Sequence, residues 1–472
     1  MSELIQTISA FSLYFITLFG IGIYFYKKNT NETDFALGNR SLNYWLTAIS
    51  AQASDMSDWL FMAFPGVLYA HGLCESWIAV GLVLFMGLTW KLVAPKLRIL
   101  SEQHGSVSFA SFLAQQLKCS SWFKILSSII CMYFFVFYIA AGLIGLGKVF
   151  QTAFGIDYHT GIIISLIITV LYTSLGGLTA IAWSDLVQGT FLLAVLCFVP
   201  LYTIFTQYNS FSHFIEISLI TVPQNFFSFI PQNGISALVT TAFGIMSWGL
   251  GYFGQPHILV NFMGIDDPKK IKSAQVVGLT WQILALSGAI AVAIVGKVFL
   301  PELANRELVF ITLVKSLFSP FFAGIILCAV LAATISTINT QTLVSATLFG
   351  HDILGSLNLN ISQHTRVMIQ RVAIFFMPLA SLYIAWNESY NVLESVLYAW
   401  NGLGSSFGPL TLLALYTNWI TPAGAYATLV TGAATSILWP HLGTTVPTLV
   451  ASYIIASSMG IVISWITKRK NI

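Results

Sequence analysis

Two carboxylates, Asp55 and Asp58, lie in the middle of an apolar run, within the stretch SAQASDMSDWLFMAFPG at 50–66. An ionised aspartate at the centre of a membrane helix costs roughly 2.5–3.5 kcal/mol even by a lenient measure. Two of them in four residues leave two interpretations. Either the carboxyls are protonated or paired inside a helix bundle, or the helix unwinds here and releases backbone carbonyls towards a cation.

A second unusual stretch, TAFGIMSWGLGYFGQPH, places three glycines and a proline inside another apolar run. Glycine weakens a helix by up to about 1 kcal/mol and proline by about 3 kcal/mol. Each of Gly249, Gly251 and Gly254 taken alone is explained by close packing of membrane helices. Together with Pro256 they predict a second interrupted helix.

A third stretch, CAVLAATISTINTQTLVSATLFG at 328–350, is rich in hydroxyl and amide side chains. Ala333, Ser336 and Thr337 stand at i, i+3 and i+4 and therefore share one helix face. A single hydroxyl in such a helix usually bonds back to the preceding turn. The density of polar residues predicts instead that this face meets something polar.

These segments belong to a chain with the composition of an integral membrane protein: 57% of residues are hydrophobic, 8% are charged and the mean hydropathy is +0.82. Five unpaired cysteines predict neither a disulfide framework nor a metal site. Apolar runs long enough to span a membrane number about thirteen. They lie near 6–26, 42–70, 75–95, 122–153, 160–180, 183–206, 235–262, 274–299, 319–348, 367–386, 391–416, 421–439 and 446–466.

Two interrupted helices about five spans apart are typical of transporters built from inverted repeats. We therefore expect one transmembrane domain over 1–472, with repeats near 42–206 and 235–416 and accessory spans at 6–26, 421–439 and 446–466. The charged segment 301–318 is expected on the outer surface. Basic residues predict a cytoplasmic C-terminus and an outside N-terminus. They are Lys27, Lys28, Arg40, Lys91, Lys96, Arg98, Lys118, Lys124, Lys269, Lys270, Lys272, Arg366, Arg371, Lys468, Arg469 and Lys470.

Six motifs resemble those of the sodium/solute symporter family and, within it, the branch of sodium/proline symporters. They are GNRSLNYWLTAISAQASDMSDW, ESWIAVGL, TSLGGLTAIAWSDLVQG, SWGLGYFGQPHIL, AATIST and YAWNGLGSSFGP, in the family's order and over nearly the whole chain. The resemblance implies an all-α fold with a LeuT-like five-plus-five inverted repeat. It also implies sodium-coupled uptake of a small solute by alternating access across the plasma membrane, in bacteria the inner membrane.

The resemblance also implies roles for particular residues. Sodium is expected between spans 2 and 9, at the carbonyls of Ala53, Met56 and Ala333 and the hydroxyls of Ser336 and Thr337. Asp55 is expected to assist sodium binding, Arg40 to act in coupling and inner gating, and the substrate to contact Ser57, Trp59, Trp248, Tyr252 and Pro256. A second sodium site near Asp185 stays open.

One departure from the family bears on the substrate. Asp58 stands where the proline branch has glycine, which leaves two possibilities: L-proline, or another amino acid or small solute such as pantothenate. The expected partners are that solute, Na⁺ as the co-transported ion and membrane lipid, with no organic cofactor, nucleic acid or obligatory protein partner.

Other classes of function fit less well. An intramembrane aspartyl protease would need facing carboxylates such as Asp55 and Asp185, but the GxGD and HExxH contexts are missing. GLIGLGK at 142–148 imitates a phosphate loop, yet Val149 replaces the required Ser or Thr. We therefore expect no enzyme. A channel or receptor would be separated from a symporter by the absence of saturable sodium-dependent accumulation.

Overall fold

The computed structural model describes residues 3–26, 32–230, 235–357 and 362–469, and these residues form helices and no β-strand. The α-helices are α1 (Glu3–Tyr26), α2 (Glu32–Leu37), α3 (Tyr44–Met56), α4 (Ala63–His71), α5 (Trp77–Leu88), α6 (Ala94–Gln103), α7 (Phe109–Gln116), α8 (Ser121–Phe154), α9 (Tyr158–Leu175), α10 (Leu178–Gln207), α11 (Phe211–Thr221), α12 (Ile235–Met246), α13 (Pro256–Gly264), α14 (Ile271–Phe299), α15 (Val309–Leu317), α16 (Pro320–Thr347), α17 (Leu354–Ser356), α18 (Gln363–Ala385), α19 (Val392–Tyr416), α20 (Pro422–Leu438) and α21 (Thr448–Arg469). Short 3-10 or π turns are η1 (Gly38–Arg40), η2 (Asp58–Leu60), η3 (Leu73–Ser76), η4 (Thr89–Val93), η5 (Gln224–Phe227), η6 (Ser247–Gly254), η7 (Pro268–Lys270), η8 (Arg306–Leu308), η9 (Leu348–Ile353) and η10 (Trp439–Leu442).

The predicted spans correspond to single helices or to helices broken by short turns. Among the described residues, 7 helical stretches are long and apolar enough to cross a membrane unbroken. The predicted spans near 42–70 and 235–262 are not among them, because each is divided into two shorter helices. The predicted spans near 6–26, 160–180, 391–416 and 421–439 are not among them either, although each contains a helix.

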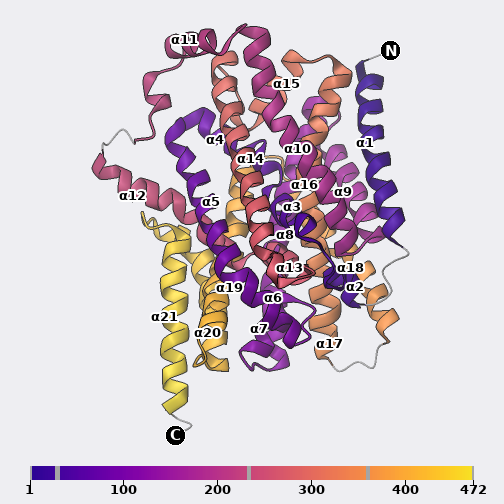
Figure 1. The fold of residues 1–472 in the computed structure, drawn as a ribbon, viewed down its shortest axis with the longest axis vertical. Coiled ribbons are helices and arrows are strands. Elements are labelled where there is room, and N and C mark those ends of the chain that lie inside the picture. The colour runs from indigo at the N-terminus through magenta and orange to yellow at the C-terminus, as the bar shows by residue number, and fades with distance from the viewer. Residues whose placement is uncertain (1–2, 27–31, 231–234, 358–361, 470–472) are drawn as a thin grey trace.

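Helix α1 begins at one end of the molecule and α21 ends at the opposite end (Figure 1). This is the arrangement that the predicted odd number of spans implies. Helices α6, α7 and α17 lie towards the C-terminal end, and α11 and α15 lie towards the N-terminal end. Three of the basic residues used to predict orientation, Lys27, Lys28 and Lys470, fall outside the described residues.

The predicted break in the second span lies at Ser57. Helix α3 ends at Met56, Ser57 takes φ 41° and ψ −165°, and the chain continues through the short turn η2 into α4. A positive φ is unusual for a residue with a side chain. Ser57 adopts it with two hydrogen bonds in place, because its N–H donates to Thr337 and its hydroxyl oxygen accepts from the N–H of Trp59.

The predicted break in the seventh span is also present, but its cause differs in part from the prediction. The glycines lie in the 3-10 turn η6, Gln255 is extended, and Pro256 begins α13. None of the three glycines has a positive φ. Instead they permit close packing, since a Cβ at Gly251 would overlap Trp400 and one at Gly254 would overlap the Gly408 backbone.

The two broken helices lie against each other. Helix α3 contacts α13, α16, α10 and α14. Below the breaks, Leu42 and Ile265 form an isolated parallel bridge, in which the Leu42 N–H donates to Gly264 O at 3.1 Å and the Asp266 N–H donates to Leu42 O at 2.8 Å. The inner ends of α3 and α13 are therefore joined through their backbones.

The charged segment 301–318 forms the turn η8 and the helix α15. The apolar residues of α15, including Phe310 and Leu313, are buried against the bundle. Glu307 is only 7% exposed, so one of its charges lies inside the protein rather than on the expected surface.

Candidate functional site

The break after α3 frees the carbonyl of Ala53 from its helical partner. In a continuous helix that oxygen would accept from the N–H of Ser57, four residues later. Here the Ser57 N–H donates to the hydroxyl oxygen of Thr337 at 3.1 Å. The Ala53 oxygen accepts instead from the Ser336 hydroxyl at 2.8 Å and the Thr337 hydroxyl at 3.3 Å. The break thus joins α3 to α16 through oxygen atoms.

Four of the five oxygens expected to hold sodium lie together at this junction. The Ser336 and Thr337 hydroxyls are 2.9 and 3.1 Å from the carbonyl oxygen of Ala333. Met56, the fifth, is buried at the last position of α3, three residues after Ala53. Hard cations take oxygen ligands, and the described residues contain no group of three or more His, Cys, Asp or Glu side chains that could hold a metal. The set suits an alkali ion.

Asp55 connects the two broken helices. Its carboxylate is buried and accepts from the Tyr252 hydroxyl at 2.5 Å, and that hydroxyl oxygen accepts from the Gln282 amide at 3.0 Å. The chain of bonds runs from α3 through η6 to α14. This contact accounts for a carboxylate at mid-span by pairing it with a phenol, and it holds the unwound segments in register.

A small cavity lies beside this bond. Its lining includes three of the predicted substrate residues, Trp59, Trp248 and Tyr252, together with Asp55, Met56, Leu82, Tyr138, Val396 and Trp400. The Trp59 and Trp248 rings meet edge to face with centroids 5.3 Å apart, and Tyr252 meets Trp400 in the same way at 5.1 Å. The cavity volume is about 20 Å³, so aromatic side chains must turn aside before a solute larger than water can enter.

The cavity offers polar groups as well as aromatic faces. The indole N–H groups of Trp59 and Trp248 are buried and have no hydrogen-bond partner among the described residues. Two free donors beside apolar ring faces suit a carboxylate on a compact apolar body.

Two predicted substrate residues lie outside this lining. Ser57 bonds to Thr337 and Trp59 at the break, and Pro256 is the buried first residue of α13. Four lining residues were not predicted: Leu82, Tyr138, Val396 and Trp400. They come from three further spans, and in the sequence they are ordinary apolar or aromatic residues within apolar runs.

Arg40 joins three segments at the end of the bundle that is predicted to face the cytoplasm. Its guanidinium donates to Met263 O at 2.7 Å, to Ser106 O at 2.9 Å and to Ser101 O at 3.1 Å. Burial, with a smaller contribution from the charge of Arg98, lowers the pKa of Arg40 to about 10, so it stays protonated at neutral pH. The same side chain therefore ties η1 to the inner end of span 7 and to the end of span 3.

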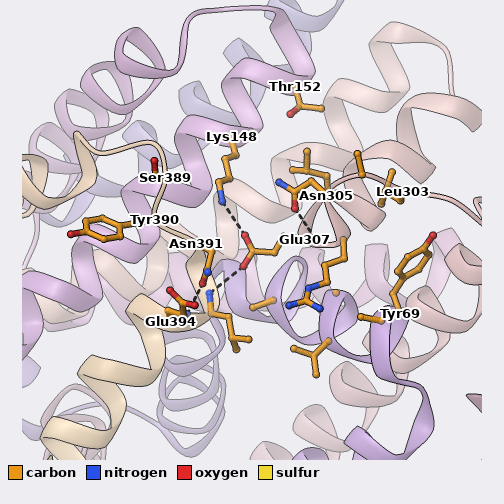
Figure 2. Close-up of a pocket in the computed structure, with 18 of the residues that line it drawn as sticks. Tyr69, Lys148, Thr152, Leu303, Asn305, Glu307, Ser389, Tyr390, Asn391 and Glu394 are labelled. Carbon is orange, nitrogen blue, oxygen red and sulfur yellow. Dashed lines mark hydrogen bonds and ion pairs between the residues drawn. The ribbon is translucent and has the colours of Figure 1, made fainter. Parts of the chain in front are cut away.

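A second cavity, of about 750 Å³, lies between α4, α8, η8 and the start of α19 (Figure 2). We name it the outer cavity after the predicted orientation. Lys148 of α8 forms an ion pair with Glu307 of η8 at 3.0 Å. Glu307 also accepts from the Leu393 N–H at 3.2 Å. This pair binds three segments on the side opposite Arg40.

Asp185 is fully buried near the start of α10, and one of its oxygens accepts from the Ser50 hydroxyl at 2.5 Å. That contact ties α10 to α3. A second sodium site near Asp185 stays a prediction.

The family model described as the sodium:solute symporter family matches residues 35–432. The chain is 37% identical over 430 residues to the high-affinity proline transporter PutP of Bacillus subtilis (strain 168), covering 90% of both chains. It is 38% identical over 445 residues to a sodium/proline symporter of Staphylococcus aureus (strain bovine RF122 / ET3-1), covering 92% of this chain and 86% of that one.

Among solved structures, the fold is similar to that of a Na⁺-coupled sialic acid symporter in a substrate-bound outward-open state. The TM-score is 0.82 at 17% identity, over 98% of each chain. The expected LeuT-like all-α fold is confirmed. With a family model over most of its length and relatives above 35% identity, this chain belongs to the sodium:solute symporter family.

Proposed function

We propose that this protein takes up L-proline together with Na⁺ by alternating access. The observation that carries the proposal is the freed Ala53 carbonyl, which the Ser336 and Thr337 hydroxyls of α16 approach at a helix break. The break lies two residues before Trp59, which lines the aromatic cavity. An ion bound to these oxygens would hold α3 against α16 and so fix the wall of the cavity.

The cavity chemistry fits proline better than a larger or more polar solute. Proline is a zwitterion with an apolar ring, and the ring would pack on the faces of Trp248 and Tyr252. Its carboxylate would accept from the free indole N–H groups of Trp59 and Trp248. The sodium/proline symporters among the relatives support the same substrate. Another amino acid or pantothenate is the alternative.

The two closures on either side of the cavity suit alternating access. Arg40 binds the inner ends of the bundle, and the Lys148–Glu307 pair binds the outer ends. With basic segments facing the cytoplasm, the N-terminus would lie outside, the C-terminus inside, and the outer cavity would face the periplasm or medium. Sodium would bind first from outside and complete the pocket before the outer closure forms.

Sodium supplies enough energy for accumulation. One charge crossing about 100 mV yields about 2.3 kcal/mol, and a tenfold sodium gradient adds about 1.4 kcal/mol. One coupled ion therefore supports roughly several-hundredfold accumulation.

The test is uptake of radiolabelled L-proline into vesicles that contain the purified protein. We expect saturable accumulation only with an inward sodium gradient, and competition by unlabelled proline but not by pantothenate or bulky amino acids. Equal uptake with and without sodium would refute the coupling. Strong competition by a different solute would refute proline as the substrate.

A further inference from the structure

Asp58 is a buried carboxylate with no ion-pair partner among the described residues. It begins η2 and its side chain is 0% exposed. The polar groups that approach its oxygens are neutral ones of its own turn, the Ser57 hydroxyl and the backbone N–H of Asp58. A buried carboxylate with no compensating group is strongly unfavourable. Its retention suggests that a partner reaches it in another state of the protein.

Helix α8 packs directly against the Asp58 carboxylate. A Cβ added at Gly145 would overlap one carboxylate oxygen, so the glycine makes room for Asp58. Lys148 stands three residues later on the same face of α8. Long helical side chains point back towards the helix N-terminus, which directs the Lys148 arm along the turn that Asp58 covers.

Lys148 is engaged elsewhere in this structure. Its ammonium pairs with Glu307 at 3.0 Å, and the two side chains are 12% and 10% exposed. Figure 2 shows this pair at the wall of the outer cavity. The charges of Lys148 and Glu307 both act on Asp58, the first attracting its negative charge and the second repelling it. Asp58 and Glu307 are thus two carboxylates within the influence of one ammonium group.

The position of Glu307 depends on whether the outer side of the protein is closed. Glu307 belongs to the short turn η8 and also accepts from the Leu393 N–H of α19. We expect outer opening to move η8 away from the start of α19 and from α8, and so to withdraw Glu307 from Lys148. Lys148 lies in the membrane-spanning helix α8, where an unpaired charge is unfavourable. After Glu307 moves away, Lys148 therefore needs another anionic partner.

We propose that Asp58 is the alternate ion-pair partner of Lys148, which moves from Glu307 to Asp58 when the outer side opens. This rests on the proposed alternating-access function and assigns Asp58 a role in it. The opened state gains an ion pair that the closed state lacks, so Asp58 favours opening while Glu307 favours closing. The switch replaces the Lys148–Glu307 ion pair of the closed state by a Lys148–Asp58 ion pair in the open state. Lys148 is therefore paired in both states.

The test measures outer opening directly in the full-length protein in lipid nanodiscs. Spin labels carried by unnatural amino acids at Ala304 and Ser389 span the outer cavity and leave the native cysteines untouched. Electron–electron distance measurements in saturating sodium then give the ratio of open to closed molecules. Asp58→Asn should lower that ratio about fivefold, and Glu307→Gln should raise it.

A double-mutant cycle decides whether Lys148 carries the effect. In a Lys148→Met background, Asp58→Asn should leave the ratio unchanged. A fivefold fall in that background, or no fall in the native background, overturns the proposal. Glu388→Gln is the matched control, because Glu388 lines the same cavity but bonds to Gln151; its ratio should not change.

A second pair of variants tests the switch without altering Asp58. In Glu307→Gln the proposal leaves Asp58 as the carboxylate partner of Lys148, so adding Lys148→Met should lower the open ratio about fivefold. No change would refute the switch even if Asp58→Asn fails to fold. Normal sodium-driven proline uptake alongside an unaltered ratio refutes the switch alone, whereas absence of that uptake in the unmodified protein refutes the proposed function.

Discussion

Replacing Ser336 by alanine should weaken sodium binding while leaving the substrate cavity intact. The change removes one hydroxyl that lies 2.8 Å from Ala53 O and 2.9 Å from Ala333 O. Without an ion, the Thr337 hydroxyl still lies 3.3 Å from the Ala53 oxygen, so the ion-free state loses little. With an ion, one oxygen ligand of the predicted five is gone.

The magnitude follows from the strength of a contact to a charged group. Such a contact contributes about 1.5–3 kcal/mol, which corresponds to an increase of about 10- to 100-fold in the sodium concentration that gives half-maximal uptake. The assay is the initial rate of labelled-proline uptake into vesicles as a function of external sodium, at saturating proline. The apparent proline affinity at saturating sodium should change by less than about threefold.

The matched control is Ser345→Ala. Ser345 is a buried serine of the same helix whose hydroxyl donates to Gln341 O at 2.8 Å, within α16. Its removal should leave the sodium dependence unchanged. If Ser336→Ala and Ser345→Ala have the same sodium dependence as the unmodified protein, the oxygen cluster is not the ion site.

Three further predictions concern the groups around this cluster. Tyr252→Phe breaks the 2.5 Å bond to Asp55 and should weaken proline binding about tenfold or more, as measured by equilibrium binding in sodium, because a buried carboxylate loses its donor; unchanged binding would contradict the assignment. Arg40→Lys keeps the charge but cannot reach all of its carbonyl acceptors, so sodium should leak without proline, which a sodium-sensitive dye in vesicles detects; tight vesicles would exclude Arg40 from the inner closure. Gly254→Ala places a methyl group against the Gly408 backbone and should abolish uptake and lower the melting temperature, whereas a stable and active variant would show that η6 and α19 can separate at no loss.

The breaks in spans 2 and 7 could be predicted from the sequence because membrane helices seldom hold such residues. Asp55 in mid-span and the dense glycines before Pro256 both violate the pattern of their surroundings. The reason for the second break could not be predicted from the sequence. Gly251 packs against the Trp400 ring, and which helix approaches a glycine depends on tertiary packing.

The aromatic cavity illustrates what apolar patterning leaves out. Trp59 and Trp248 could be predicted as substrate contacts from the family resemblance. Tyr138 and Trp400 line the same cavity, but each lies in a long and mostly apolar helix. With little contrast between the faces of such a helix, periodicity does not indicate which face meets the cavity.

The burial of Glu307 could not be predicted from the sequence, for a different reason. It lies in a charged segment, where an exposed position is the ordinary expectation, yet it is 7% exposed and paired with Lys148. The two residues are 159 positions apart in the chain. Only the folded arrangement reveals that a charged loop reaches into the bundle.

The backbone bridge between Leu42 and Ile265 limits how the inner side can open. Two amide hydrogen bonds join the segment before α3 to the end of α13. We therefore expect these two helices to move together. We therefore expect the inner side to open when neighbouring helices move away from α3 and α13, rather than when α3 and α13 separate from each other. The ion and the substrate would then stay bound beside α3 and α13, whose relative position does not change, while the neighbouring helices move.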